Sequence, residues 1–239
     1  MKTKEEHLVN DKLLTEFIPY REAVGSLLYL STISRPDISI AVNYLSRYCN
    51  KPMQSHWKLV KRVFQYLKGT IMNEISFNRD DKIFAYSDAD CAGEPVTHIL
   101  TSGVLILRGG PIVWFTQKQS LVTKSTSEAE YRGAISSIDD ICWIRRIGNE
   151  LGFVNPEEST TLFVDNKSLI HMLQNVHEGK SIKGKKHIEI KRKFIQQHIG
   201  QTIEVKHVRS CDQLADILTK PLTAKPFVNI CNKIIKVEC

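Results

Sequence analysis

The spacing of apolar residues changes near residue 80, and this change limits the fold more than any other feature of the sequence. Up to residue 76 apolar side chains recur at helical intervals; within 55–70, for example, Trp57, Val60 and Phe64 fall on one face. After residue 80 the apolar runs are short and are separated by glycine, proline and polar residues, which is typical of strands. The sequence therefore predicts three parts, a helical segment over 1–76, a sheet-containing domain over 80–222 and a carboxyl-terminal tail over 223–239.

The order of the expected elements predicts the kind of sheet. Strands are expected at 82–88, 101–109, 111–118, 160–166 and 201–208. Helices are expected at 125–152, 167–175 and 185–200, and a last one from 212. The first three strands follow one another through short turns, which favours antiparallel pairing, whereas the strand–helix–strand connections favour parallel pairing. The predicted fold class is α/β, a mixed five-stranded sheet with flanking helices, preceded by a small helical segment.

Composition and charge restrict the setting in which the chain works. The net charge is +7, a basic excess that suggests affinity for polyanions. The six cysteines form no CxxC pair, so a zinc site and a disulfide framework are disfavoured. The opening MKTKEEHLVN is too charged for a signal peptide, and Arg108 interrupts the most apolar run. We expect a soluble intracellular protein that makes no use of a membrane.

Four acidic residues stand at corresponding places in the predicted sheet. Asp88 ends the first strand, Asp165 ends the fourth, and Glu130 and Asp216 lie in the first turns of two helices. Sites in open α/β sheets form at the carboxyl ends of strands, so these acids are expected to converge. Carboxylates that converge repel one another unless cations lie between them, and oxygen ligands suit Mg²⁺ or Mn²⁺. Two such ions about 3.5–4 Å apart would hold the attacking and leaving oxygens of a phosphodiester.

Each acid also has a purely structural interpretation. Asp88 suits the start of a turn, and Asp165 suits the N-cap of the helix that follows it. Glu128 and Glu130 each fit a capping box that begins at a serine three residues earlier, and for Glu128 we prefer this interpretation. One acid alone is weak support for a metal site. The recurrence of acids at one predicted sheet edge favours a shared site.

The segment 212–220 offers two aspartates for one place in that site. Asp212 suits the N-cap of the last helix. Asp216 comes one turn later, and because helical side chains lean toward the N-terminus, its carboxylate would point back to the sheet edge. The small Ala215 beside it would let the helix approach closely. We expect Asp216 to complete the site.

A basic segment runs from residue 180 to residue 193. It carries seven lysines and arginines against one acid, Glu189. Such a run is usually a solvated helix face, but beside a phosphodiester-cleaving site phosphate binding becomes the preferred interpretation. The candidate nucleic-acid-binding residues are Lys180, Lys183, Lys185, Lys186, Lys191, Arg192 and Lys193.

Several motifs, in order, resemble the carboxyl-terminal part of the Pol polyprotein of copia-type LTR retrotransposons. Those that resemble its ribonuclease H domain are YSDADCAG, STSEAEY, LFVDNKSLI, KKHIEIKRKFI and DQLADILTKPL. Upstream, YREAVGSLLYLSTISRPDISIAVNYLSRY and HWKLVKRVFQYLKGT resemble the thumb- or connection-like segment that follows the polymerase palm. The resemblance covers roughly residues 16–225.

This resemblance implies a ribonuclease H-like fold and a metal-dependent endonuclease that cleaves the RNA strand of RNA–DNA hybrids. The catalytic metal ligands would be Asp88, Glu130, Asp165 and Asp216, with two Mg²⁺ ions that Mn²⁺ can replace. In an intact polyprotein, the palm and fingers of a reverse transcriptase would be an upstream partner. A cytoplasmic location is expected, with virus-like particles and the nucleus as alternatives.

The sequence departs from the family pattern at several places. Cys91 stands where the family commonly has tryptophan, and THILTSG at 97–103 replaces a basic, hydroxyl-rich stretch. His207 falls within the fifth strand rather than in a catalytic loop, so we interpret it as structural or weakly substrate-facing. The chain has no Tyr-x-Asp-Asp sequence, and we expect no polymerase activity from it alone.

Two other functions stay open at this point. The first is a catalytically inactive nucleic-acid-binding remnant of a retrotransposon, which would keep the fold and the basic face. The second is a DDE-type strand-transfer nuclease, which would share a similar sheet. Four acids rather than three, and the lack of an upstream zinc-binding His/Cys region, argue against the strand-transfer nuclease.

Overall fold

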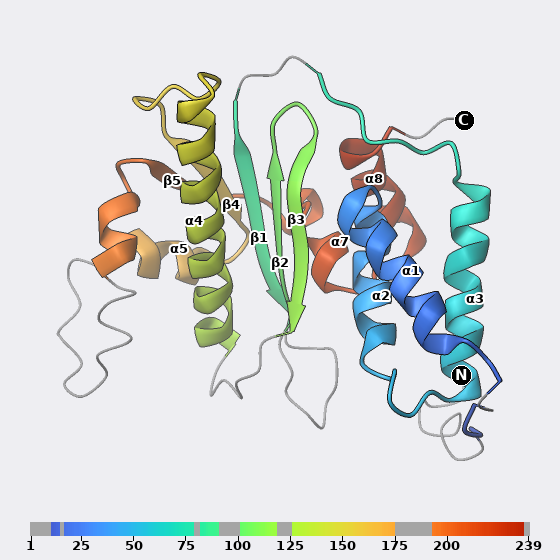
Figure 1. The fold of residues 1–239 in the computed structure, drawn as a ribbon. Coiled ribbons are helices and arrows are strands. Elements are labelled where there is room, and N and C mark those ends of the chain that lie inside the picture. Colours follow the sequence, from blue (N-terminus) through green and yellow to red (C-terminus); the bar gives the residue numbers. More distant parts are fainter. Residues whose placement is uncertain are drawn as a thin grey trace.

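A computed structural model of the chain describes residues 11–14, 17–78, 82–90, 101–118, 126–174 and 193–236. A five-stranded sheet forms the centre of the molecule, and helices cover both of its faces (Figure 1). The amino-terminal helices lie together on one side of the sheet, and the long helix α4 lies on the other.

The sheet is mixed and has the strand order β3-β2-β1-β4-β5. Its strands are β1 (Phe84–Asp90), β2 (Thr101–Leu107), β3 (Pro111–Lys118), β4 (Thr160–Val164) and β5 (Ile203–His207). β2 pairs antiparallel with both β1 and β3, whereas β4 pairs parallel with both β1 and β5. The predicted mixed five-stranded sheet, with its flanking helices and preceding helical segment, is therefore confirmed. β1 runs two residues beyond the expected end at Asp88, since its pairing with β2 continues to Asp90.

Helices make up most of the rest of the described chain. The elements are α1 (Tyr20–Ile33), η1 (Pro36–Ile38), α2 (Ser39–Ser46), α3 (Gln54–Gly69), α4 (Thr126–Glu150), α5 (Lys167–Gln174), η2 (Ser210–Asp212), α7 (Asp216–Thr219) and α8 (Ala224–Ile234). Residues 193–198 are also helical. None of the helices within the described ranges combines the length and the apolar character needed to cross a membrane.

Alternating side chains give the sheet two apolar faces, and each face has its own core. Ala85 and Val104 point into a core that α4 and α5 cover. Leu105 belongs to the opposite face, where α7 and α8 supply most of the buried side chains. Asp88 lies three residues after Ala85 in β1, so the two side chains point to opposite faces of the sheet. The side chain of Asp88 therefore lies on the face that α7 covers.

The amino-terminal helices have a third core and are attached to the edge of the sheet. This core contains Tyr20, Val24, Leu27, Ile38, Val42, Leu45 and Val60. The indole Nε1 of Trp114 in β3 donates a hydrogen bond to the carbonyl of Ser31, at 2.6 Å. The side-chain amide of Asn43 donates to the carbonyl of Thr116, also in β3, at 3.2 Å. Polar contacts therefore join α1 and α2 directly to the outermost strand.

The stretch expected to be a tail contains an ordered helix. α8 carries Ile230, Cys231 and Ile234, all buried against the sheet face that α7 also covers. Phe227 of the same helix meets Tyr66 of α3 edge-on, with ring centroids 5.9 Å apart. α8 thus lies between the sheet and the amino-terminal helices. The division of the chain into 1–76, 80–222 and 223–239 stays a prediction.

Candidate metal centre

The register of two parallel strands brings Asp88 and Asp165 to the same level. Tyr86 in β1 pairs with Phe163 in β4, so a step of two residues along each strand leads to Asp88 and Asp165. Side chains two residues apart on a strand point to the same face. Asp165 directly follows Val164, the last residue of β4. The expected convergence of these two acids at the carboxyl ends of neighbouring strands is therefore built into the sheet.

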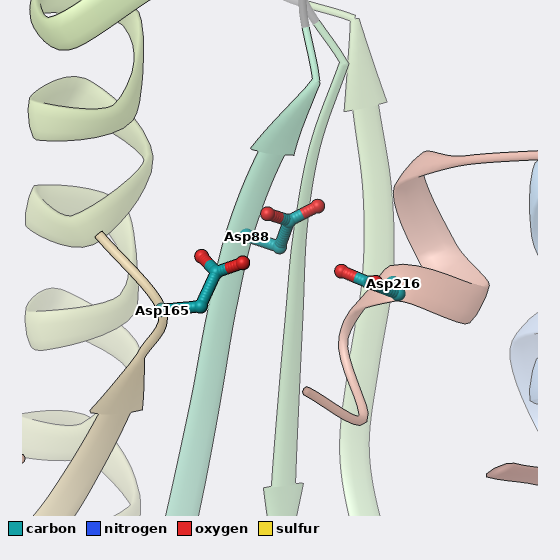
Figure 2. Close-up of side chains that lie close together, drawn as sticks. All are labelled: Asp88, Asp165 and Asp216. Carbon is teal, nitrogen blue, oxygen red and sulfur yellow. The ribbon is translucent and has the colours of Figure 1, made fainter. Parts of the chain in front are cut away.

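Asp216 approaches the same place from a different element. It is the first residue of α7, and this short helix packs across β1 and β2. The carboxylates of Asp88, Asp165 and Asp216 turn toward a common space (Figure 2). One ligand oxygen from each residue can be chosen so that all three lie within 4.8 Å of one another. Asp88 and Asp216 are each only 8% exposed, so water compensates little of their charge.

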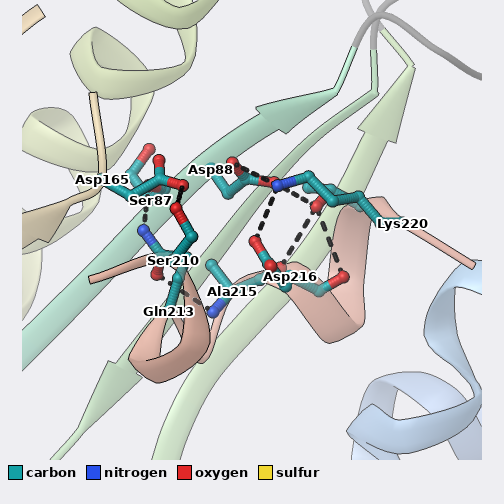
Figure 3. Close-up of polar contacts among 9 residues, drawn as sticks. Ser87, Asp88, Asp165, Ser210, Gln213, Ala215, Asp216 and Lys220 are labelled. Atoms are coloured by element: carbon teal, nitrogen blue, oxygen red, sulfur yellow. Dashed lines mark hydrogen bonds and ion pairs between the residues drawn. The ribbon is translucent and has the colours of Figure 1, made fainter. Parts of the chain in front are cut away.

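A lysine supplies positive charge to this cluster. The Nζ atom of Lys220 lies 2.9 Å from Oδ1 of Asp216 and 3.2 Å from Oδ2 of Asp88 (Figure 3). The neighbouring Thr219 donates a hydrogen bond from its hydroxyl to Oδ2 of Asp88. Asp165 receives a hydrogen bond from the hydroxyl of Ser210, at 3.1 Å. Each carboxylate thus has at least one donor from the segment that follows β5.

The electrostatics of the cluster favour a bound cation. Burial raises the pKa of Asp216 to about 6, the negative charge of Asp88 adds to this, and Lys220 partly offsets it. Burial would lower the pKa of Lys220, but the charges of Asp88 and Asp216 outweigh it, and the pKa lies above its ordinary value. The carboxylate oxygens already surround one cation, the ammonium group of Lys220. Such hard oxygen ligands also suit Mg²⁺ or Mn²⁺. The residues present therefore fit a divalent ion.

A buried glutamine shapes the segment that carries Asp216. Gln213 is fully buried, and its amide Nε2 donates to the carbonyl of Ser87, at 3.1 Å. Its Oε1 accepts from the backbone N–H of Ala215, at 3.3 Å. Ser87 immediately precedes Asp88, so Gln213 fixes the start of α7 relative to β1.

Three of the four predicted acids meet in the structure, and the fourth lies on the helix next to them. Glu130 lies in α4, one turn before Gly133. A Cβ atom added to Gly133 would be 3.6 Å from the Cβ of Ala89, so this part of α4 passes close to the end of β1. The side chain of Glu130 falls outside the described part of the chain.

Asn166 caps the helix that Asp165 could have capped, whereas no side chain caps α7. Oδ1 of Asn166 accepts from the backbone N–H groups of Ser168 and Leu169, at 2.8 and 3.2 Å, so Asn166 caps α5. The expectation that Asp212 caps the last helix is wrong. Asp212 ends the separate turn η2, and Asp216 begins α7, because Gln213 between them is extended and buried.

Several sequence predictions fall on residues that the structure does not describe. These are the basic residues from Lys180 to Arg192, the departures at Cys91 and 97–100, and the two groups of the capping box, Ser125 and the side chain of Glu128. Lys193, the last of the basic residues, begins the helical residues 193–198 and is exposed. His207 is exposed at the end of β5, where it pairs with Val164.

Sequence reasoning missed the donors around the carboxylates. These are Ser210, Gln213, Thr219 and Lys220. The four-residue spacing of Asp216 and Lys220 is the sequence signal that could have revealed one of them. Ser210 and Gln213 carry no such signal, since their partners come from distant strands.

The chain is similar to polyproteins of plant transposons. It is 38% identical over 220 residues to the Retrovirus-related Pol polyprotein from transposon RE2 of Arabidopsis thaliana, covering 90% of this chain. It is 37% identical over 226 residues to the corresponding polyprotein from transposon RE1 of the same plant. For transposon TNT 1-94 of Nicotiana tabacum the identity is 32% over 222 residues. The chain spans 15–16% of the length of these relatives.

Solved structures give a more distant likeness. LC11-RNase H1, in complex with an RNA/DNA hybrid, shares 19% identity with a TM-score of 0.42, over 58% of this chain and 94% of that one. The N-terminal RNase H domain of rv2228c from Mycobacterium tuberculosis shares 16% identity with a TM-score of 0.39, over 64% of this chain and 97% of that one. No protein-family model matches the sequence.

Proposed function

Because the chain belongs with the Pol polyproteins of copia-type retrotransposons, we propose that it is their ribonuclease H part, a metal-dependent endonuclease that cleaves the RNA strand of RNA–DNA hybrids. The convergence of Asp88, Asp165 and Asp216 beside the carboxyl ends of β1 and β4 carries this proposal. A purely structural role accounts poorly for two buried aspartates and a third beside them. Nucleic-acid hydrolysis by metal ions needs such a set of hard ligands.

The four acids would together be the metal ligands. Asp88, Asp165 and Asp216, together with Glu130 from α4, would hold two Mg²⁺ ions, or Mn²⁺ in their place. Such ions, when bound, lower the pKa of a water molecule and stabilise the leaving 3′ oxygen. The chain itself orients the ligands, because Thr219 and Ser210 each hold a carboxylate by a hydrogen bond.

The basic segment would hold the substrate. Lys180, Lys183, Lys185, Lys186, Lys191, Arg192 and Lys193 would contact the phosphates of the hybrid by charge, without reading its bases. Discrimination between RNA and DNA would rest on the 2′-hydroxyl groups and on the A-form-like shape of the hybrid. In an intact polyprotein, a reverse transcriptase palm upstream would supply the hybrid.

Cleavage of a labelled hybrid tests the proposal. A hybrid labelled on the RNA strand is incubated with the purified chain and Mg²⁺, with EDTA and duplex DNA as controls. We expect cut RNA only with the hybrid and the metal ion. Salt-dependent binding of the hybrid without cleavage would instead support an inactive nucleic-acid-binding remnant. The departures from the family pattern at Cys91 and 97–100 favour that alternative.

A further inference from the structure

Lys220 occupies an unusual place for a lysine. It follows directly after α7, and its ammonium group contacts both buried carboxylates, Asp88 and Asp216 (Figure 3). Oδ1 of Asp88 also accepts a hydrogen bond from Nζ, at 3.3 Å. The backbone of the same turn presents Thr219 to Asp88, so two consecutive residues meet one carboxylate. The ammonium group therefore lies among oxygens that the proposed function assigns to a metal ion.

This contact differs from an ordinary surface ion pair. The side chains of Asp88 and Asp216 are 6% and 12% exposed, and that of Lys220 is 31% exposed. The exposed pair Lys206–Glu204 offers a comparison, since both of its side chains are about half exposed, at 49% and 50%. Exposed pairs contribute little to stability, whereas removing one partner of a buried pair leaves a charge uncompensated.

We propose that Lys220 is a built-in counter-ion of the carboxylate site, which stabilises the fold without metal and which a divalent ion must displace. The proposal rests on the metal site of the proposed function. A lysine and a divalent ion that both bind Asp88 and Asp216 compete, because they need the same oxygens and repel each other. The flexible four-carbon stem and the partial exposure of Lys220 allow its ammonium group to turn toward solvent.

Two opposite effects of one substitution follow from this. Replacing Lys220 by the neutral methionine should destabilise the metal-free protein, because Asp88 and Asp216 lose their shared cation. The same replacement should strengthen metal binding, because the ion no longer displaces a charged group. A lysine that merely supports the local structure would produce the first effect without the second.

The test compares Lys220→Met with the wild-type chain in two measurements that need no substrate. Titration calorimetry with Mn²⁺ should show binding that is roughly tenfold tighter in the variant. Thermal unfolding in EDTA should show a lower melting temperature for the variant, and saturating Mn²⁺ should raise that temperature more than in the wild type. Lys206→Met, in the exposed pair, is the matched control and should leave Mn²⁺ affinity unchanged.

Lys220→Gln is the second variant, because its amide can still donate to Asp216 if the methionine variant does not fold. It too should bind Mn²⁺ more tightly than the wild type. Equal or weaker Mn²⁺ binding by the folded neutral variant would overturn the role of Lys220 and leave the metal site standing. Absence of Mn²⁺ binding from wild type and variants alike would overturn the metal site itself, and the proposal with it.

Discussion

Gly103 pairs with Asp88 across the β1–β2 ladder, and α7 packs where Gly103 has no side chain. A Cβ atom added to Gly103 would lie 2.7 Å from the Cβ of Leu218 and 2.8 Å from Cγ2 of Thr219. These distances are too short for real contacts. The missing side chain therefore allows α7 to lie close enough for Thr219 to reach Asp88.

Gly103→Ala should consequently move α7 away from the sheet. We expect a loss of about 1–3 kcal/mol in the free energy of unfolding, as for other overpacked cores, and a marked fall in Mn²⁺ affinity and hybrid cleavage. Denaturant unfolding and calorimetry measure the two effects.

Gly25→Ala is the matched control for this substitution. Gly25 lies in the exposed part of α1 with no atom within 4 Å of an added Cβ. The change should stabilise the helix by about 0.5–1 kcal/mol and leave cleavage as it is. A Gly103→Ala protein with wild-type metal affinity would show that the approach of α7 does not set the geometry of the site.

The two aspartates near the end of the chain should respond differently to amidation. Asp216→Asn removes a proposed metal ligand, so cleavage should fall by about 100-fold or more and should need a higher Mg²⁺ concentration, while the fold stays nearly intact. Asp212 is more exposed and pairs with Arg209 and Lys233, so Asp212→Asn should be mild. Hybrid cleavage across a Mg²⁺ titration compares them. An inactive Asp212→Asn variant together with an active Asp216→Asn variant would show that Asp212, and not Asp216, belongs to the site.

The general fold was predictable because its signals are local. The change from helical to strand-like spacing near residue 80 identifies the elements, and the chirality of strand–helix–strand connections limits how they assemble. Asp88 and Asp165 were found for the same reason, since the apolar runs that precede them can be recognised from composition. The helix α8 could also have been predicted from the sequence, because Phe227, Ile230 and Ile234 recur at helical intervals.

The course of the segment after β5 was not predictable in the same way. A continuous helix from residue 212 was expected, whereas the buried Gln213 interrupts it by bonding to Ser87, a residue 126 positions away. Lys220 was missed because a lysine four residues after an aspartate is usually an exposed helix pair. In both cases the deciding partner lies on β1, and no local pattern in the sequence indicates it.

Removing the Gln213 side chain should therefore affect both stability and the site. Gln213→Ala leaves the carbonyl of Ser87 and the N–H of Ala215 without their partners, which should cost about 1–3 kcal/mol. Mn²⁺ affinity should fall by roughly tenfold, because the segment no longer fixes the ligand Asp216. Chemical denaturation and calorimetry give both values, with the exposed Gln201→Ala as control. Unchanged Mn²⁺ affinity in a destabilised Gln213→Ala protein would limit Gln213 to a structural role.

The helical segment should show an acid-sensitive contact at His56. Burial lowers the pKa of His56, with Asp11 opposing, and its Nδ1 accepts the backbone N–H of Met53, at 3.1 Å. Since the folded pKa lies below the ordinary value of 6.5, the unfolded chain binds more protons below that pH. The stability that neutral His56 contributes is therefore present above about pH 6.5 and is lost as the pH falls through the folded pKa.

His56→Gln keeps an acceptor for the N–H of Met53 but cannot take up a proton. Its melting temperature should fall less than that of the wild type between pH 7.5 and pH 5, two values chosen on either side of about 6.5, the ordinary histidine pKa. His198, whose pKa is also lowered by burial, contributes equally to both proteins and cancels from the difference. Parallel pH profiles for the two proteins would show that His56 does not titrate in this contact.

The central claim, that the converging aspartates hold metal for cleavage of the RNA strand, is tested most directly at Asp88. Hybrid cleavage is measured with Mg²⁺ for the wild type and for Asp88→Asn, after calorimetry and thermal unfolding have compared their Mn²⁺ binding and their folding. We expect the wild type to cut the RNA strand, and the folded variant to bind Mn²⁺ weakly and to leave the strand intact. Cleavage by Asp88→Asn at the wild-type rate would contradict the account.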